Sequence, residues 1–264
     1  MKSNHRRSEI LQTLEERGSV SVVDEAERFG VSPMTVRRDL LDLEKAGLAR
    51  RVHGGAVIGR GRSFEPPYLV RENEASEAKE RIARTTAALI AESDSIAIDT
   101  GSTCLEVAEQ LKGRRNITVV TPAMRVAQAL FDQPDLRVVM TGGMLRPGEG
   151  SLTGDFAVRA FQNLSVDRLI LATAGIDATF GISDYNWDDV LVKQAMVGSA
   201  KEVIVVADSS KFGRVAFARI AGLEIIDKLV TDVAPEGELA EALRVAGVKV
   251  IIAEPLALAS TNFA

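Results

Sequence analysis

The chain of 264 residues contains a single cysteine, Cys104, and only two histidines, His5 and His53. One cysteine excludes an internal disulfide and a cysteine-rich zinc site, and a buried apolar role fits this residue better than that of a nucleophile. Both histidines lie in the first quarter of the chain. The rest therefore lacks the side chain that Ser/His/Asp and Cys/His hydrolases and most histidine metal sites require. We expect no catalytic residue, no metal and no cofactor.

Long apolar runs are also missing. No run approaches the roughly 18 residues that cross a bilayer, and the polar N-terminus lacks the apolar core of a signal peptide. These absences predict a cytoplasmic protein without a membrane partner. Hydrophobic residues nevertheless make up 46% of the chain, which is enough for a sizeable core, and the length exceeds one typical domain.

The charge is divided unevenly along the chain. Residues 1–62 carry 12 lysines and arginines against 9 aspartates and glutamates, a balance of +3, whereas residues 63–264 carry 20 against 28, a balance of −8. An acidic body is repelled by DNA, so contact with nucleic acid should be confined to the N-terminal part and should depend strongly on salt.

Two helices joined by a short turn are predicted in that N-terminal part. The first covers residues 21–29, where apolar residues repeat at the spacing of one buried helical face, and Gly30 ends it. Ser32 can cap the second helix by accepting a backbone N–H bond, and Pro33 suits its first helical position. We expect Gly47 to end the second helix.

The second helix exposes Met34, Thr35, Arg37 and Arg38 near its start, as a helix that enters the DNA major groove does. One arginine can reach a guanine edge while the other holds a phosphate, and the sequence does not decide which does which. The plainer alternative is a solvated helix face on which Asp39 pairs with an arginine.

A basic segment follows, with glycines at its bend, and is predicted to form a two-stranded wing over residues 48–57 that lies against the phosphate backbone. A helix upstream, Arg6 to Arg17, supplies apolar residues that close a three-helix core. Residues 1–58 are therefore predicted to form a winged helix-turn-helix domain. The candidate DNA-binding residues are Ser32, Pro33, Met34, Thr35, Arg37, Arg38, Arg50, Arg51 and His53.

Residues 6–57, with VSPMTVRRDLLDLEKAGLARRVHGGAV at their centre, resemble the N-terminal domain of the DeoR/GlpR family of bacterial transcription regulators. The paired arginines and the terminal HGGA carry this resemblance. It implies that double-stranded operator DNA is a partner.

Residues 59–75 break the periodicity with glycine and proline and are predicted to be a linker. Beyond them, in residues 76–264, helices alternate with strands, which implies an α/β domain with a mainly parallel sheet. The expected helices are 76–91, 104–111, 122–131, 188–199 and 236–246, and the expected strands are 95–98, 117–120, 136–140, 168–173, 203–207, 225–230 and 248–252.

Ligands bind beyond the C-terminal ends of such strands, where the loops here are polar. Asp99-Thr100-Gly101-Ser102-Thr103 follows the first strand and opens a helix, offering N–H groups, hydroxyls and the positive end of a helix dipole to a phosphate. The loop has neither the spacing of a Walker A motif nor that of a dinucleotide fingerprint. An ordinary capped helix start explains this turn about as well when it is considered alone.

The loops that follow three further strands also carry residues suited to a ligand-binding site. Thr141-Gly142-Gly143 permits close backbone approach, Gly175-Ile176-Asp177 offers a carboxylate, and Asp208 to Gly213 offers Lys211. Lys193 and Lys211 are predicted to supply the positive charge that a phosphate monoester needs. Asp99 and Asp177 are predicted to accept hydrogen bonds from sugar hydroxyls, although capping the next turn is a nearly equal alternative for Asp177.

Residues 65–252 resemble the sensor domain of the same family, which is similar in fold to ribose-5-phosphate isomerase, and this resemblance implies a phosphorylated sugar effector. The candidate effector-binding residues are Asp99, Thr100, Gly101, Ser102, Thr103, Thr141, Gly142, Gly143, Asp177, Lys193 and Lys211. The family usually has a glutamate shortly before the lysine that matches Lys193, whereas Asp188 and Asp189 stand there in this chain.

The resemblance implies a homo-oligomer, dimer or tetramer, that represses a sugar catabolic operon and is released by the effector. Whether it represses or activates is not encoded in these residues. The alternative is an isomerase-like enzyme fused to a DNA anchor. Isomerisation requires a second acid near Asp177 as a general base, but Ala178 and Thr179 follow it here.

Overall fold

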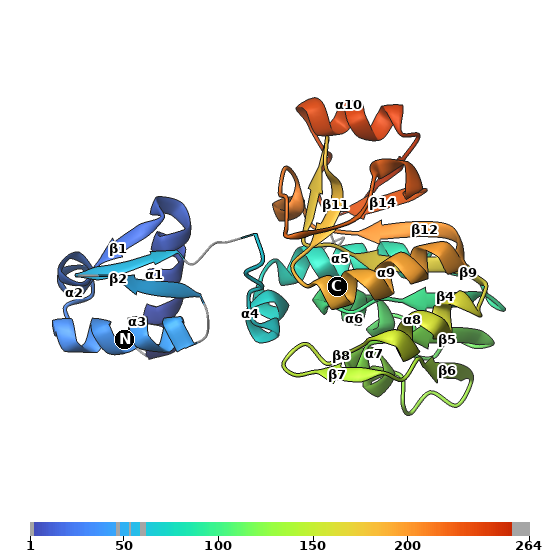
Figure 1. Cartoon of the computed structure of the whole chain (residues 1–264), viewed down its shortest axis with the longest axis horizontal. Helices are drawn as coiled ribbons and strands as arrows, with labels where there is room; N and C mark the ends of the chain where they lie inside the picture. The colour runs from blue at the N-terminus through green and yellow to red at the C-terminus, as the bar shows by residue number, and fades with distance from the viewer. Residues whose placement is uncertain (1–2, 46–47, 53, 59–61, 255–264) are drawn as a thin grey trace, which may run out of the picture. The chain divides into compact units, whose positions relative to one another are not determined.

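The computed structural model describes residues 3–45, 48–52, 54–58 and 62–254. It divides into two units, Met1–Pro67 and Tyr68–Ala264 (Figure 1). The first is a winged helix-turn-helix unit and the second contains a parallel sheet flanked by helices, which confirms the predicted fold class. Among the described residues, no helix is long and apolar enough to cross a membrane.

The first unit packs its helices around a small apolar core. Its elements are α1 (Ser3–Arg17), β1 (Ser19–Ser21), α2 (Val22–Phe29), α3 (Pro33–Lys45), β2 (Ala49–Val52) and β3 (Gly55–Ile58). Ile10 and Leu14 of α1 meet Val36, Leu40 and Leu43 of α3, and all five are buried. The helical spacing of these residues in the sequence therefore corresponds to a real core.

Side chains and glycine define the predicted helix ends. Ser21 Oγ accepts hydrogen bonds from the N–H groups of Val23 and Asp24 at the start of α2, and Gly30 ends that helix in the left-handed conformation with φ 61°. Ser32 Oγ accepts the N–H of Thr35 at 3.2 Å, which confirms the predicted cap of α3. Gly47 lies outside the described residues.

The wing has three strands rather than two, in the order β1-β3-β2. The sequence did not predict β1, which is only three residues long and joins the sheet by pairing with β3. Gly55 makes this pairing possible, because a Cβ atom at that position would lie 2.0 Å from the carbonyl oxygen of Val20. The second glycine of the HGGA segment is thus required by strand packing.

The second unit is built on a seven-stranded parallel sheet with the order β15-β14-β12-β9-β4-β5-β6. Its strands are β4 (Ser95–Ile98), β5 (Ile117–Thr121), β6 (Leu136–Met140), β9 (Val166–Ala172), β12 (Ala200–Val206), β14 (Lys228–Thr231) and β15 (Lys249–Ile252). Each predicted strand has its counterpart here. The strand predicted from residue 225 begins at Lys228, because Leu223–Ile225 form a 3₁₀ turn, η2.

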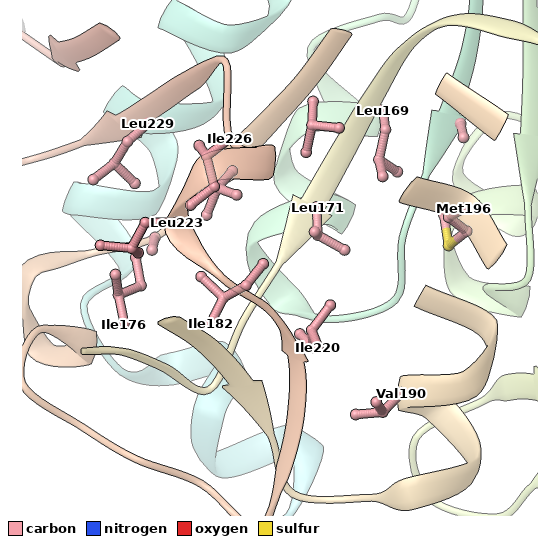
Figure 2. Close-up of a cluster of buried hydrophobic side chains, with 14 of the residues drawn as sticks. Leu169, Leu171, Ile176, Ile182, Val190, Met196, Ile220, Leu223, Ile226 and Leu229 are labelled. Carbon is pink, nitrogen blue, oxygen red and sulfur yellow. The ribbon is translucent and has the colours of Figure 1, made fainter. Parts of the chain in front are cut away.

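Helices cover both faces of this sheet. They are α5 (Ser76–Ala87), α6 (Ser102–Glu109), α7 (Met124–Ala129), α8 (Asp155–Gln162), α9 (Trp187–Ser199) and α10 (Gly237–Val245). Alternate residues of one strand point to opposite faces. In β9, Leu169 and Leu171 pack with α8, α9 and α10, whereas Ile170 packs with α5, α6 and α7. Figure 2 shows the cluster on the first face, with Leu169 and Leu171 near its centre.

Several short elements were not predicted. Besides β1, they are α4 (Tyr68–Asn73), α8 (Asp155–Gln162), the antiparallel hairpin β7 (Met144–Arg146) and β8 (Ser151–Thr153), the small sheet of β10 (Gly175–Asp177), β11 (Gly181–Asp184) and β13 (Ala218–Ala221), and the 3₁₀ turn η1 (Ser209–Lys211). The predicted linker 59–75 thus contains a helix, α4, whose Tyr68 is buried. The segment Gly175–Asp177, expected to be a loop, is a strand.

Candidate functional site

The outward face of α3 carries the residues predicted to read DNA. Met34 is 68% exposed, and Pro33, Arg37 and Arg38 are also exposed, while Thr35 is half-buried. Within the described parts of the chain, neither Arg37 nor Arg38 makes a hydrogen bond or an ion pair. Both guanidinium groups are therefore available to a ligand on this face.

Asp39, the acid next to this arginine pair, points into the unit instead. It is 3% exposed and forms a bidentate ion pair with Arg6 of α1, with Arg6 Nε at 2.6 Å and Nη2 at 3.2 Å. This hydrogen bond raises the pKa of the Arg6 guanidinium above its usual value. Asp39 thus pairs with an arginine, as in the plainer alternative, but this arginine is Arg6 of α1 and neither Arg37 nor Arg38.

The wing contributes less free positive charge than the sequence suggests. Arg51 is held by Glu44 at the end of α3, through Nε at 2.6 Å and its backbone N–H at 3.0 Å. The other two predicted wing contacts are not described, because the side chain of Arg50 and the whole of His53 lie outside the described residues.

A buried ion pair lies under the loop that follows β4. Lys193 of α9 is 1% exposed and donates to Asp99, which is also 1% exposed. Its ammonium lies 3.1 Å from Ala172 O and 3.1 Å from the Asp184 carboxylate. Burial raises the pKa of Asp99 to about 6, although Lys193 opposes this shift. For Lys193 burial lowers the pKa, but Asp99 and Asp184 outweigh it and hold the pKa above its usual value.

This geometry changes the roles predicted for both residues. The three N–H donors of the Lys193 ammonium face three protein oxygens, so no donor remains for a phosphate. Asp99 Oδ2 accepts from Lys193 and from the N–H of Ala172 at 3.1 Å, and the side chain does not reach the surface. The pair fixes β4, β9 and α9 relative to one another beneath the site.

Other cations gather above the loop, at the N-terminus of α6. Lys79 of α5 is 4% exposed and donates to the carbonyl of Arg71 in α4. Ser102 Oγ donates to the same carbonyl at 3.4 Å. Burial lowers the pKa of Lys79 and of Lys211, while Asp208 opposes both shifts. The Lys211 ammonium lowers the pKa of Lys79 further, and Arg214 lowers that of Lys211.

We call Lys79, Lys211, Ser102 and the N-terminus of α6 the cation cradle. The N–H groups of the first helical turn have no partner inside the helix. Lys79 shares the Arg71 carbonyl with Ser102 of that turn, and Lys211 is near enough to Lys79 to lower its pKa. An anion placed there gains hydrogen bonds from both, and its charge relieves the repulsion between the lysines. Sequence reasoning found Ser102 and Lys211 but missed Lys79, because a lysine in an amphipathic helix such as α5 carries no signal of its burial.

The hairpin β7–β8 brings further charged groups to the same end of the sheet. Glu149, in its turn, is 6% exposed, pairs with Arg71 and accepts from Thr100 Oγ1 at 3.3 Å. Arg146 pairs with Asp189 at 2.9 Å, and Ser151 Oγ also donates to that carboxylate, at 2.7 Å. Arg71, Arg146, Glu149 and Ser151 were not singled out from the sequence, since neither α4 nor the hairpin was predicted.

Two predicted segments have structural roles in the described contacts. Gly143 packs so closely on the hairpin that a Cβ atom would lie 2.5 Å from Thr153 O, and Thr141 hydrogen-bonds back to Thr121 O at 3.3 Å and to Gly142 O at 3.2 Å. Asp177 Oδ1 accepts from the N–H groups of Thr179 and Phe180 at 2.9 and 2.8 Å. Asp177 therefore caps the next turn, the alternative considered for it.

The described residues provide neither a metal site nor a reactive thiol. The described part of the chain holds no cluster of three or more histidines, cysteines, aspartates or glutamates arranged to bind a metal ion. Cys104 is fully buried, and burial raises the pKa of its thiol well above the usual value. A thiol kept protonated in this way is a packing group, not a nucleophile.

Comparison with known proteins matches both units. Residues 6–60 match the model of the DeoR-like helix-turn-helix domain, and residues 74–233 match that of the DeoR C terminal sensor domain. The chain is 35% identical over 252 residues to the putative aga operon transcriptional repressor of Escherichia coli O157:H7, covering 95% of this chain and 94% of that protein. It is 33% identical over 243 residues to the glycerol-3-phosphate regulon repressor of Escherichia coli strain K12, covering 92% and 96%.

Among solved structures, the chain is similar to ribose 5 phosphate isomerase A from Neisseria gonorrhoeae. The similarity covers 52% of this chain and 53% of that one, with 18% identity and a TM-score of 0.39.

Proposed function

The chain belongs to the DeoR family of transcription regulators, and we propose that it represses a carbohydrate operon and leaves its operator when a phosphorylated sugar binds the sensor unit. The observation that supports the DNA half most strongly is that Arg37 and Arg38 form no hydrogen bond or ion pair with any described residue, while the neighbouring Asp39 is engaged by Arg6. Guanidinium groups without a protein partner can bind guanine edges and phosphates at no cost of breaking an ion pair.

We propose that α3 enters the major groove with its N-terminal end first, so that Met34, Arg37 and Arg38 face the bases or the backbone. A homo-oligomer, dimer or tetramer, then places two such helices on repeated half-sites. The acidic balance of residues 63–264 keeps the sensor unit away from the DNA.

The effector half of the proposal is supported by the cation cradle. Two ammonium groups of lowered pKa, one hydroxyl and the first turn of α6 provide the donors that a phosphate monoester requires. One relative is named for glycerol 3-phosphate and another for the aga operon, so phosphate esters of small polyols and of sugars are the compounds to test first. We propose no catalytic step, because the Asp177 carboxylate that an isomerase would need caps a turn.

The DNA half can be tested with the full chain and fragments of its own genome. Fragments that the protein retains are sequenced, and the affinity for the recovered operator is measured by fluorescence anisotropy. We expect Arg37→Ala and Arg38→Ala each to cost about 1–3 kcal/mol of operator affinity, with sequence discrimination lost in whichever variant removes a base contact. Arg84→Ala is the matched control, because it removes an equal charge from an exposed pair in the sensor unit. Operator binding by both α3 variants at the level of this control would refute the assignment.

The effector half can be tested without the operator. The melting temperature of the purified protein is measured against sugar phosphates, glycerol 3-phosphate and their unphosphorylated parents, since a ligand of the folded state raises it. We expect a rise with a phosphate ester and none with its parent. The ester that raises it should also release the operator in the anisotropy assay. No shift across a broad panel would remove the support for a phosphorylated effector and leave the DNA-binding assignment intact.

A further inference from the structure

Helix α4 is the first element of the sensor unit after Pro67, the last residue of the DNA-binding unit. It packs against α6 (Figure 1), and its contacts involve members of the cation cradle. The carbonyl of Arg71, in its last turn, accepts from Lys79 Nζ and from Ser102 Oγ. Both donors belong to the group that we assign to the phosphate.

The side chain of Arg71 extends this link to the other side of the loop. Its guanidinium pairs with Glu149 in the β7–β8 turn, and Glu149 also accepts from Thr100 Oγ1. The same turn is connected to the start of α4 through Arg125, which donates to Glu149 O at 3.4 Å and lies 3.8 Å from the centre of the Tyr68 ring. Both ends of α4 are therefore fastened to elements that border the loop at 99–103.

Tyr68 shows that this arrangement carries a cost. The residue is 4% exposed, and its hydroxyl makes no hydrogen bond to any part of the chain that the structure describes. A buried hydroxyl without a partner loses the hydrogen bonds that water would give it. A position of α4 in which this hydroxyl reaches water or another acceptor is thus favoured as soon as the contacts of Arg71 weaken.

We infer that α4 is a clamp that an anion in the cation cradle loosens, and that it is the element through which effector binding reaches the DNA-binding unit. This inference rests on the proposed function. A phosphate dianion attracts the Lys79 ammonium and the Ser102 hydroxyl more strongly than a neutral carbonyl does. The Arg71 carbonyl then loses both donors, and the chain that leads to Pro67 loses one of its anchors on the sensor unit.

Hydrogen–deuterium exchange of the full chain tests this clamp, with inorganic phosphate and glycerol 3-phosphate as probes and sodium chloride of equal ionic strength as reference. We expect the first turn of α6 to become protected while the amides of α4 exchange about five-fold faster or more, the lower limit of typical coupling. Amides of α10 should not change. Protection of α6 with unchanged or slower exchange in α4 would overturn the clamp and leave the effector proposal standing. No protection of α6 with either probe would overturn both.

Two variants should change the exchange rate of the α4 amides in opposite directions, which a general loss of stability does not do. Glu149→Gln removes the anchor of the Arg71 side chain, so α4 should exchange faster without phosphate, and phosphate should add little. Tyr68→Phe removes the unpartnered hydroxyl, so α4 should exchange more slowly than in the parent protein. Glu202→Gln is the matched control, because Glu202 also pairs with an arginine, Arg168, but in strand β12. Faster exchange of α4 in Tyr68→Phe than in the parent protein would refute the inference. So would an acceleration of α4 exchange in Glu202→Gln as large as that in Glu149→Gln.

Discussion

Replacing Lys193 by methionine should destabilise the sensor unit severely and in a manner that depends on pH. The variant keeps the length of the side chain but leaves Asp99, 1% exposed, without an ammonium partner. Removing one member of a buried ion pair costs about 3–5 kcal/mol, because the remaining charge is neither hydrated nor paired. The exposed pair of Lys201 with Asp167, 2.8 Å apart, provides the control, and Lys201→Met should cost no more than about 1 kcal/mol.

The pH dependence follows from the pKa of Asp99, which is raised to about 6 even with Lys193 present. Without the ammonium it must rise further. A carboxyl whose pKa is higher in the folded than in the unfolded state favours folding below its unfolded pKa, and this contribution is lost as the pH rises through the folded value. The free-energy deficit of Lys193→Met should therefore be largest at pH 8 and shrink toward pH 5.

Urea unfolding followed by tryptophan fluorescence measures this deficit, because the only tryptophan, Trp187, is the first residue of α9, the helix that carries Lys193. In the double variant Lys193→Met/Asp99→Asn the fully buried charge of Asp99 is removed as well, and only the less buried Asp184 loses its lysine partner. The double variant should therefore be more stable at pH 8 than Lys193→Met alone. A Lys193→Met deficit no larger than that of Lys201→Met, or one independent of pH, would refute the reasoning.

Three further changes test other parts of the structure. Lys211→Ala should weaken the binding of an active phosphate ester by about tenfold or more, as expected for the loss of one charge-assisted hydrogen bond. Operator affinity measured by anisotropy should stay unchanged. If the ester shifts the melting temperature of this variant as much as that of the parent protein, the cation cradle is misplaced. Gly55→Ala should lower the free energy of unfolding by about 1–3 kcal/mol, because the added Cβ collides with Val20 O. Circular dichroism should show a lower melting temperature of the first unit. Equal melting temperatures of the variant and the parent protein would contradict the packing argument. Arg6→Ala should cost about 3–5 kcal/mol by breaking the buried ion pair with Asp39, whereas Arg7→Ala, which breaks a half-exposed pair with Asp42, should cost about 1 kcal/mol or less. Equal losses would show that burial of the first pair has no energetic consequence.

The sequence predicts the parallel sheet well because its inner strands, such as β9, β12 and β14, are largely buried and contain short apolar runs. Residues 95–98 and 136–140, for example, are strands at the expected positions. The elements that escaped prediction are short and depend on distant partners. β1 has three residues and exists because Gly55 lets β3 approach Val20. The hairpin β7–β8 likewise consists of two three-residue strands that no periodicity reveals.

The candidate site, too, contains features that the sequence predicts and features that it does not. The loop at 99–103 is predictable because a strand, a glycine and two hydroxyls occur together before a helix. Whether a charged side chain faces a ligand or the core is not predictable, since it depends on partners far away in the sequence. Lys193 meets Asp99 across 94 positions, and Lys79 reaches the loop from a helix that precedes it. Arg6 is 33 positions from Asp39, so the sequence offered a neighbouring arginine as the more obvious partner.

On α3, the residues that stabilise the fold and the residues proposed to contact DNA lie on different faces. This separation has a consequence for how a regulator of this kind diversifies. The residues that hold the helix in place, Val36, Asp39, Leu40 and Leu43, are all buried, whereas Arg37 and Arg38 are exposed and form no hydrogen bond or ion pair within the described chain. A lineage can therefore exchange the outward side chains one at a time without endangering the fold that presents them. After gene duplication, a copy could acquire a new target sequence by single steps, each of which yields a stable protein. The inward ion pair to Arg6 is what keeps that evolutionary path open.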